Sequence, residues 1–240
     1  DGNSILNRAF YGIKVLTTKE GLYTNGIYGF LTMLQRLRDE VNPNAVAVAF
    51  DRKEPTFRHL AYADYKAQRK GMPEELAVQM PVLKEVLDTL NIPRYEMEGW
   101  EADDLIGTIS RKCEAAGWDC TIATGDRDSL QLITDRTRVK LVTSRMGQTS
   151  TTDMTPALFR EQYGFDPIHM IDLKALMGDS SDNIPGVPGV GEKRKRALLK
   201  HFQTAQALRL SPEAIKKRLR RANARLRAEL EGWYYDDESD

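Results

Sequence analysis

The sequence predicts an α/β fold in which a mostly parallel central sheet is covered by helices. Short apolar runs of strand length alternate with longer segments of helical periodicity through about residue 145. This alternation is typical of parallel sheets, because the crossover between two parallel strands is usually a helix that covers one face. The chain of 240 residues is also long enough to bury a core without disulfides or metal staples.

The individual elements follow from local patterns. An amphipathic helix is expected over residues 24–41, because Ile27, Phe30, Leu34 and Leu37 recur at three- and four-residue spacing. The other elements expected in this region are, in order, a buried strand at 45–50, a helix at 73–90, a short strand at 92–98, a helix at 101–116, and strands at 120–124 and 139–142.

The last third of the chain has a helical pattern. Helices are expected from residue 155 onward, with breaks near Gly164 and over residues 178–191, where glycine and proline gather. Residues 211–231 predict a basic amphipathic helix, with Ser211 as its N-cap. Residues 236–240 form an acidic tail.

The charge of the chain is balanced overall but not locally. Lys and Arg together number 35, as do Asp and Glu, so the formal net charge at pH 7 is zero. Taken alone, this balance argues against a nucleic-acid partner. Basic residues nevertheless dominate residues 52–70 and 192–231, whereas the remaining body is acidic. Such basic stretches indicate either a solvated helix face or a phosphate-binding surface.

The composition excludes several other classes. The longest apolar run covers residues 45–50, far short of the ~20 residues that span a bilayer, so no membrane partner is expected. Two cysteines, Cys113 and Cys120, cannot form a disulfide framework, which favours a reducing cytoplasm. Together with three scattered histidines they provide no zinc cluster.

Nine acidic residues fall on loops that a doubly wound sheet would bring together. Asp51 and Asp126 directly follow expected strands, and ligands of open α/β sheets bind outside the carboxyl ends of the strands. Because the set offers only oxygen ligands, it favours two hard ions such as Mg²⁺ or Mn²⁺. The candidate metal residues are Asp1, Asp51, Glu101, Asp103, Asp104, Asp126, Asp128, Asp179 and Asp182.

Each of these acids also has a structural interpretation when it is considered alone. Acids in the first turn of a helix stabilise its dipole, and Gly-Asp-Arg-Asp is a good turn sequence. The conjunction favours metal binding, because nine carboxylates at one rim would repel one another unless they recruit cations or protons. If Asp1 occupies a strand end, as Asp51 does, that strand is expected to precede residue 1.

Residues 56–70 combine basic and aromatic side chains, a mixture that suits single-stranded nucleic acid. On a helix, one face would carry Arg58, Tyr62, Tyr65, Lys66 and Arg69. Because the segment follows the strand that ends at Asp51, it is expected to lie above the acidic rim and to hold a phosphodiester there. The alternative is a surface helix whose tyrosines pack on the body.

A Gly-rich turn lies between residues 184 and 193 and opens an expected helix. Such a turn presents free backbone N–H groups to phosphates without reading bases. The candidate DNA-binding residues here are Gly186, Gly189, Gly191 and Lys193. A plain helix–helix turn is the alternative interpretation.

Seven stretches, taken together, resemble one family. The chain is similar to the 5′-nuclease domain at the N-terminus of bacterial DNA polymerase I, which is related to phage 5′-nucleases and flap endonucleases. The matching stretches are Asp1-Gly-Asn-Ser, Ala47-Val-Ala-Phe-Asp51, Pro55-Thr-Phe-Arg-His59, Tyr65-Lys-Ala-Gln-Arg69, Glu101-Ala-Asp-Asp104, Thr124-Gly-Asp-Arg-Asp128, and residues 173–186. The run Arg194-Lys195-Arg196 departs from the small and apolar residues that the family usually has there.

The resemblance implies a domain organisation. Residues 1–180 would form a PIN-like α/β nuclease core with a helical arch at about 52–72. Residues 181–235 would form a helical clamp, of the helix-hairpin type, that grips duplex DNA, and residues 236–240 would be the tail. A polymerase domain would belong to the parent chain.

The resemblance also implies roles for individual residues. Asp1, Asp51 and Asp103 would hold the catalytic ion, and Asp126, Asp128 and Asp182 the second ion. Lys66 and Arg69 would contact the scissile phosphate, and Tyr65 would stack on a base. A K⁺ ion would occupy the helix-hairpin turn.

The function expected from these features is structure-specific hydrolysis of phosphodiester bonds in 5′-flap or 5′-ended DNA, in replication and repair. The enzyme is expected to use two metal ions and to act as a monomer in a bacterial cytoplasm. A catalytically impaired nucleic-acid binder of the same fold is the main alternative. A small-molecule phosphatase or a compact ribonuclease is a further one, but neither explains the basic segment together with the Gly-rich turn.

Overall fold

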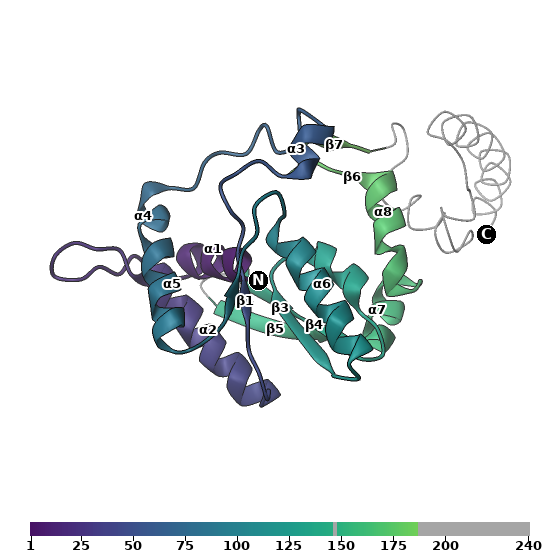
Figure 1. The fold of residues 1–240 in the computed structure, drawn as a ribbon, viewed down its shortest axis with the longest axis horizontal. Helices are drawn as coiled ribbons and strands as arrows, with labels where there is room; N and C mark the ends of the chain where they lie inside the picture. The colour runs from purple at the N-terminus through teal and green to yellow at the C-terminus, as the bar shows by residue number, and fades with distance from the viewer. Residues whose placement is uncertain (146–147, 187–240) are drawn as a thin grey trace, which may run out of the picture. The chain divides into compact units, whose positions relative to one another are not determined.

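The computed structural model describes residues 1–145 and 148–186 of the chain (Figure 1). The helix expected at 211–231, the acidic tail, and Gly189, Gly191 and Lys193 lie outside the described residues. Within these ranges the α/β class is confirmed, since helices and strands alternate from the first helix to the last strand.

The strands form separate hydrogen-bonded groups. β1 (Val48–Ala49) pairs in parallel with β2 (Arg94–Tyr95), and β3 (Cys120–Thr124) pairs in parallel with β4 (Thr137–Arg145). β4 also pairs antiparallel with β5 (Gln148–Met154). Two pairs thus have the expected direction, but the expected single sheet is divided. β5 was not expected, because it is composed almost entirely of polar residues and lacks the apolar pattern of a core strand.

Several helices lie where the sequence predicts them. α2 (Asn25–Val41) and α6 (Ala102–Ala115) begin and end within one residue of the expected limits. The helix expected at 73–90 is divided into α4 (Glu74–Ala77) and α5 (Gln79–Thr89). The division has a local cause, because Pro81 clashes with the carbonyl four residues earlier, where α4 ends.

The first helix was not expected. α1 (Gly2–Gly12) begins directly after Asp1, whose carboxylate accepts a hydrogen bond from the Ser4 N–H at 2.9 Å. Asp1 is therefore an N-cap. Its amino nitrogen donates to the Ala123 carbonyl of β3 at 3.0 Å, which places the carboxylate beside the end of that strand.

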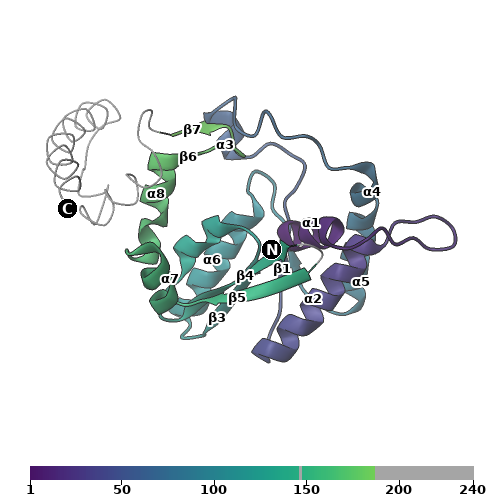
Figure 2. The same cartoon turned by 180° about the vertical axis from the view of Figure 1, so that it is seen from behind.

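The last described part contains short elements. The break expected near Gly164 is confirmed, since Gly164 ends a helix with φ of 79°. The elements are α7 (Pro156–Tyr163), the 3₁₀ helix η2 (Pro167–His169), α8 (Met170–Met177), and the antiparallel pair β6 (Gly178–Asp179) and β7 (Ile184–Pro185). Together with β6 and β7, α3 (Phe57–Ala61) lies beyond the end of the three-stranded group (Figures 1 and 2).

The helical arch expected at about 52–72 is helical only in α3. From Ala63 to Gln68 the backbone forms turns, and Lys66 has a left-handed φ of 55°. The expectation that five basic and aromatic residues share one helix face is therefore wrong. A left-handed residue cannot continue a right-handed helix, so this segment bends instead.

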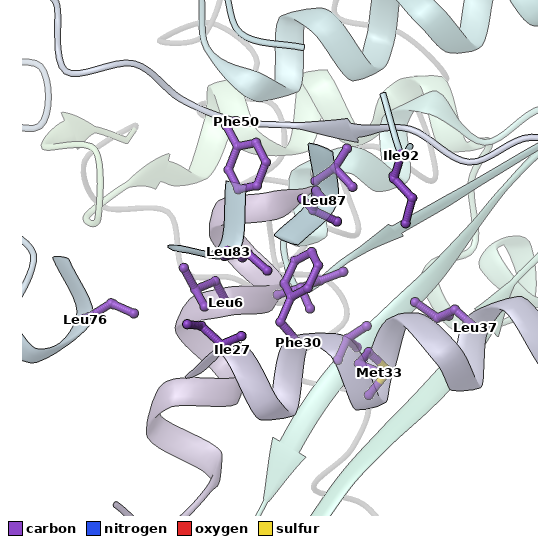
Figure 3. Packing of buried hydrophobic residues seen from close by; sticks show 13 residues of the cluster. Leu6, Ile27, Phe30, Met33, Leu37, Phe50, Leu76, Leu83, Leu87 and Ile92 are labelled. Atoms are coloured by element: carbon purple, nitrogen blue, oxygen red, sulfur yellow. The ribbon is translucent and has the colours of Figure 1, made fainter. Parts of the chain in front are cut away.

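Two buried clusters hold the described fold together. One joins α1, α2, β1, α4 and α5 around Leu6, Phe30, Phe50 and Leu83 (Figure 3). The other joins β3, β4 and η1 (Arg127–Leu132) to α7 and α8. β1 is packed in the first cluster and β3 in the second. Buried contacts therefore fix the positions at which these two strands end.

Gly2 is expected to be required by the first cluster. A Cβ at Gly2 would lie 2.3 Å from Cε1 of the fully buried Phe50 ring. Gly2→Ala should lower the free energy of unfolding by about 1–3 kcal/mol, measured by urea denaturation. Gly107→Ala in α6 is the control, because its Cβ would lie 3.5 Å from Leu132; it should raise stability by about 0.5–1 kcal/mol. Equal stability of the two variants would contradict this expectation.

Candidate active site

The strand ends bring several of the expected acids together. Asp51 follows β1, and its carboxylate accepts a hydrogen bond at 2.7 Å from the N–H of Ala102, the first residue of α6. The other carboxylate oxygen of Asp1 accepts from Thr124 Oγ1, at the end of β3, at 2.6 Å. Asp126 follows the same strand and caps η1. The end of β1 thus lies beside the start of α6 through Asp51, and the end of β3 lies beside Asp1.

Asp103 shows that these carboxylates act on one another. Burial, and next the negative charges of Asp126 and Asp51, raise the pKa of Asp103 to about 7. Within residues 1–145 and 148–186, the carboxylates of Asp1, Asp51, Asp103 and Asp126 form no ion pair with a Lys or Arg side chain. These four, which we call the open acids, therefore form a negative cluster without a basic side chain at ion-pair distance.

The other five candidate acids have basic partners. Two of them, Glu101 and Asp104, are paired with basic residues of the segment after β1. Arg58 donates two hydrogen bonds to Asp104, at 2.7 and 2.8 Å. Burial works in the opposite direction, but these bonds hold the pKa of Asp104 below its usual value. Lys66 Nζ lies 2.7 Å from Glu101, whose residue is only 8% exposed. The basic segment therefore contacts the acidic residues at the start of α6.

Tyr65 and Arg69 connect the same segment to the loop after α8. The Tyr65 hydroxyl donates to Glu101 at 2.9 Å and approaches Asp182 at 3.2 Å. Arg69 forms an ion pair with Asp182 at 2.5 Å. The Tyr65 residue is 5% exposed, and burial followed by the charge of Glu101 raises the pKa of its hydroxyl. Base stacking by Tyr65 thus requires its ring to leave this position.

Three further hydrogen bonds join the segment to that loop. The Tyr62 hydroxyl donates to the Asn183 carbonyl at 3.3 Å, and the Asn183 side chain donates to the Asp64 carbonyl at 2.9 Å. The backbone N–H of Lys66 donates to the Asp182 carbonyl at 3.0 Å. Residues far apart in sequence are thus joined, and Asn183 is a member of the site that the sequence did not indicate.

Lys174 is the second residue that sequence reasoning missed. Its Nζ lies 2.6 Å from Asp128 and 2.8 Å from Asp179. Burial opposes the change, but hydrogen bonds from Lys174 and Ser181 lower the pKa of Asp179 to about 2. Lys174 lies on α8 within the stretch 173–186, five residues before Asp179, but its spacing alone does not show which acids it meets.

Gly186, a candidate for phosphate contact, has a packing role here. A Cβ on Gly186 would lie 1.9 Å from the Met177 carbonyl oxygen, and one on Gly178 would lie 2.2 Å from the Gly186 nitrogen. Gly178 also has a left-handed φ of 72°. Both glycines are therefore needed for the close approach of β6 and β7.

The donor set suits a hard divalent ion in its chemistry. All nine candidate ligands are carboxylates, which Mg²⁺ and Mn²⁺ prefer. In the described part of the chain, however, no three Asp, Glu, His or Cys side chains converge closely enough to form a metal-binding group. Ion binding would therefore require side chains to move closer together, and five of the acids would also have to leave their basic partners.

Comparison with known proteins identifies related sequences. Residues 1–164 match the 5′-3′ exonuclease N-terminal resolvase-like domain, and residues 165–234 match the 5′-3′ exonuclease C-terminal SAM fold. DNA polymerase I of Bacillus subtilis is 45% identical over 208 residues, which cover 87% of this chain and 23% of that protein. The chain thus spans about a quarter of the length of the curated relatives that it matches.

Two solved structures share the fold. A complex of the bacteriophage T5 D15 flap endonuclease with DNA and metal ions has a TM-score of 0.66 at 23% identity and covers 86% of this chain and 75% of that one. A T5 5′-exonuclease with bound divalent zinc ions has a TM-score of 0.64 at 25% identity and covers 84% and 73%.

The fold and the acidic rim define an α/β protein of the resolvase-like nuclease class. The chain belongs to the 5′-3′ exonuclease family, since both domains of that family match it in order over residues 1–234. The family expected from the seven sequence stretches is therefore confirmed.

Proposed function

We propose that this chain hydrolyses phosphodiester bonds at or near a 5′ end or 5′ flap of DNA, in replication and repair, with two divalent ions such as Mg²⁺ or Mn²⁺. The observation that carries the proposal is the cluster of open acids at the ends of β1 and β3. A negative cluster of oxygen donors without close basic partners attracts hard cations. The metal and DNA contents of the T5 structures support this assignment.

The chain offers two sets of ligands. Asp1, Asp51 and Asp103 would hold the catalytic ion, and all three belong to the open acids. Asp126, Asp128 and Asp182 would hold the second ion, with Glu101, Asp104 and Asp179 around the two sites. When bound, such a pair of ions supplies charge neutralisation at the phosphate and a nucleophile from water. Asp128 and Asp182 must first release Lys174 and Arg69.

The basic side chains have a second role in this proposal. Lys66 and Arg69 are held 2.7 and 2.5 Å from acids of the site, so a phosphate that enters can take these donors from Glu101 and Asp182. Charged donors aimed at a phosphoryl group stabilise the charge that develops on it. Arg58 would contact the same strand, and Tyr62 and Tyr65 would meet its bases.

Several finer assignments belong to the same proposal. Gly186, Gly189, Gly191 and Lys193 would contact duplex phosphates, with a K⁺ ion at that turn, and residues 181–235 would act as the clamp. The named relatives support a polymerase portion in the parent chain and a bacterial cytoplasm as location. No helix in the part of the chain that the structure describes could cross a membrane. A monomer is proposed.

The test is cleavage of a labelled 5′-flap DNA in the presence of Mg²⁺. We expect a product cut near the flap junction, and we expect Asp126→Asn to abolish it. Cleavage that survives excess chelator, or that persists undiminished in Asp126→Asn, would contradict the metal mechanism. Hydrolysis of a generic phosphomonoester, with flap DNA left intact, would favour a phosphatase.

A second candidate function is DNA binding without turnover. Its support is that Arg58, Lys66, Arg69 and Lys174 together hold five of the nine acids in ion pairs. If these pairs persist with substrate, the ions cannot be held as proposed. This candidate predicts salt-dependent binding of flap DNA with no product at any Mg²⁺ concentration.

A further inference from the structure

A groove of about 630 Å³ runs along the outer side of α6 and is bounded by η1. One end is lined by Asp103, Asp104 and Asp128, together with Arg58, so the groove opens from the acidic site. The other end is lined by Arg111 and Lys112, in the last turns of α6. A hollow of similar size on the outer face of α2 is lined by none of the nine candidate metal residues.

The wall of the groove contains a buried hydroxyl without a partner. Ser129, on η1, is 3% exposed, and among the described residues its Oγ has no hydrogen-bond partner. Two neighbouring polar side chains of the groove are paired: Thr108 Oγ1, on α6, donates to the Asp104 carbonyl, and Gln131, on η1, donates to that of Asp128. Leaving a buried hydroxyl unpaired is unfavourable, so Ser129 Oγ is available to a hydrogen-bonding group that reaches this wall.

The floor of the groove contains a glycine that internal packing does not require. Gly107 lies in the middle of α6, where glycine is less favourable than alanine. A Cβ there would lie 3.5 Å from Leu132, which is ordinary contact. The protein itself has room for a side chain at this position. Glycine therefore leaves space in the groove in which a ligand can approach the backbone of α6.

The charges at the far end favour a phosphate-bearing occupant. Among the described residues, Arg111 is paired only with Glu114, at 3.0 Å, and its side chain is 54% exposed. Lys112 is exposed and forms no ion pair within residues 1–145 and 148–186. The helical rise from Asp104 to Arg111 is ~10 Å, which corresponds to about three base steps along the axis of a duplex at 3.4 Å each. One strand could therefore reach both ends.

We propose that this groove holds the phosphodiester backbone of one substrate strand, about three nucleotides from the cleaved bond. Arg111 and Lys112 would contact phosphates, Ser129 would donate to a phosphate oxygen, and Gly107 would allow the backbone to approach. The inference rests on the proposed function and extends it. None of these four residues was among the candidates from the sequence.

Binding of fluorescently labelled 5′-flap DNA in excess chelator tests the groove without any need for turnover. The double variant Arg111→Glu/Lys112→Glu should bind at least about tenfold more weakly at moderate salt. Its slope of log K against log salt should be smaller by about two. The double variant Lys19→Glu/Arg160→Glu is the matched control: it also reverses two charges, Arg160 is 56% exposed and paired with one carboxylate, and Lys19 is exposed. Equal losses in the two proteins would overturn the proposal.

Two variants that change no charge distinguish binding in the groove from a general effect of net charge. Gly107→Leu should weaken binding several-fold with an unchanged salt slope and with a thermal midpoint no lower than that of the parent. Ser129→Ala should weaken binding a few-fold while the midpoint of the free protein rises, because an unpaired buried hydroxyl is removed. Parental affinity in both variants would overturn the proposal.

The outcomes for the groove and for the proposed function are distinct. If the parent protein cleaves flap DNA and every groove variant binds like the parent, the groove proposal fails and the proposed function stands. If the parent binds but never cleaves, while the groove variants lose affinity, the groove stands and the nuclease proposal fails. Absence of binding by the parent protein would overturn both.

Discussion

Asp103→Asn is expected to abolish cleavage and, at the same time, to stabilise the metal-free protein above neutral pH. Removal of one carboxylate from the open acids should lower the single-turnover rate by about 100-fold or more. The stability effect follows from the pKa of Asp103, which burial and the charges of Asp126 and Asp51 raise from 3.8 to about 7. Ionising this buried group is therefore unfavourable in the folded state.

The sign of the pH dependence follows from proton binding. Between pH 4 and 7 the folded state holds the Asp103 proton more often than the unfolded state does, so the parent loses stability as the pH rises. The loss is complete above pH 7 and amounts to about 4 kcal/mol at most, at ~1.4 kcal/mol per pKa unit. Asp103→Asn lacks this loss, so the two proteins should differ at pH 8 and converge near pH 4.

Thermal unfolding in chelator at pH 4, 6 and 8 measures this difference. Asp135→Asn is the control, because Asp135 is an exposed carboxylate that forms no ion pair in the described ranges. Added Mg²⁺ should stabilise the parent and Asp135→Asn at pH 8, but not Asp103→Asn, since ion binding to the folded state raises its stability. A constant difference between the parent and Asp103→Asn at all three pH values would refute the assignment.

Lys66→Ala is expected to slow the chemical step by ~2.7–4 kcal/mol, which is about 100- to 1000-fold, by analogy with removal of one charged or oxyanion donor. The same substitution leaves Glu101 with Tyr65 at 2.9 Å and Arg58 at 3.7 Å as its remaining close partners. A buried carboxylate that loses its closest cation destabilises the fold, so a lower melting temperature is also expected.

Single-turnover kinetics with saturating flap DNA separate these two effects, provided that they are measured below the melting temperature of the variant. Lys70→Ala is the control, because Lys70 lies in the same segment, is exposed, and has no ion pair among the described residues. A rate for Lys66→Ala within a factor of two of the parent would count against a role for Lys66 at the phosphate.

Part of the site could be predicted from the sequence because it depends on local rules. The apolar run before Asp51 and the run before Asp126 have strand length, and parallel strands end at a common edge. The same logic placed Glu101 and Asp103 at the start of a helix, where α6 begins. These acids are where their local patterns require them to be.

Other parts could not be predicted, because they depend on contacts between distant residues. Segment 56–70 has a helical pattern of charges, yet its chain turns at Lys66, whose backbone N–H bonds to Asp182. Lys174 bridges Asp128 and Asp179, although no local rule distinguishes it from other helical lysines. Ser129 and Gly107 stand out only when the groove between α6 and η1 is seen.

The α/β class, the family and the acids that follow the strands can be read from residue types and their short-range spacing. Which acids are open and which are paired with basic side chains depends on the folded chain, because the charge of a carboxylate is set by its burial and by its neighbours in space. Asp103 and Asp104 are adjacent in the chain, yet the pKa of one is raised and that of the other is lowered.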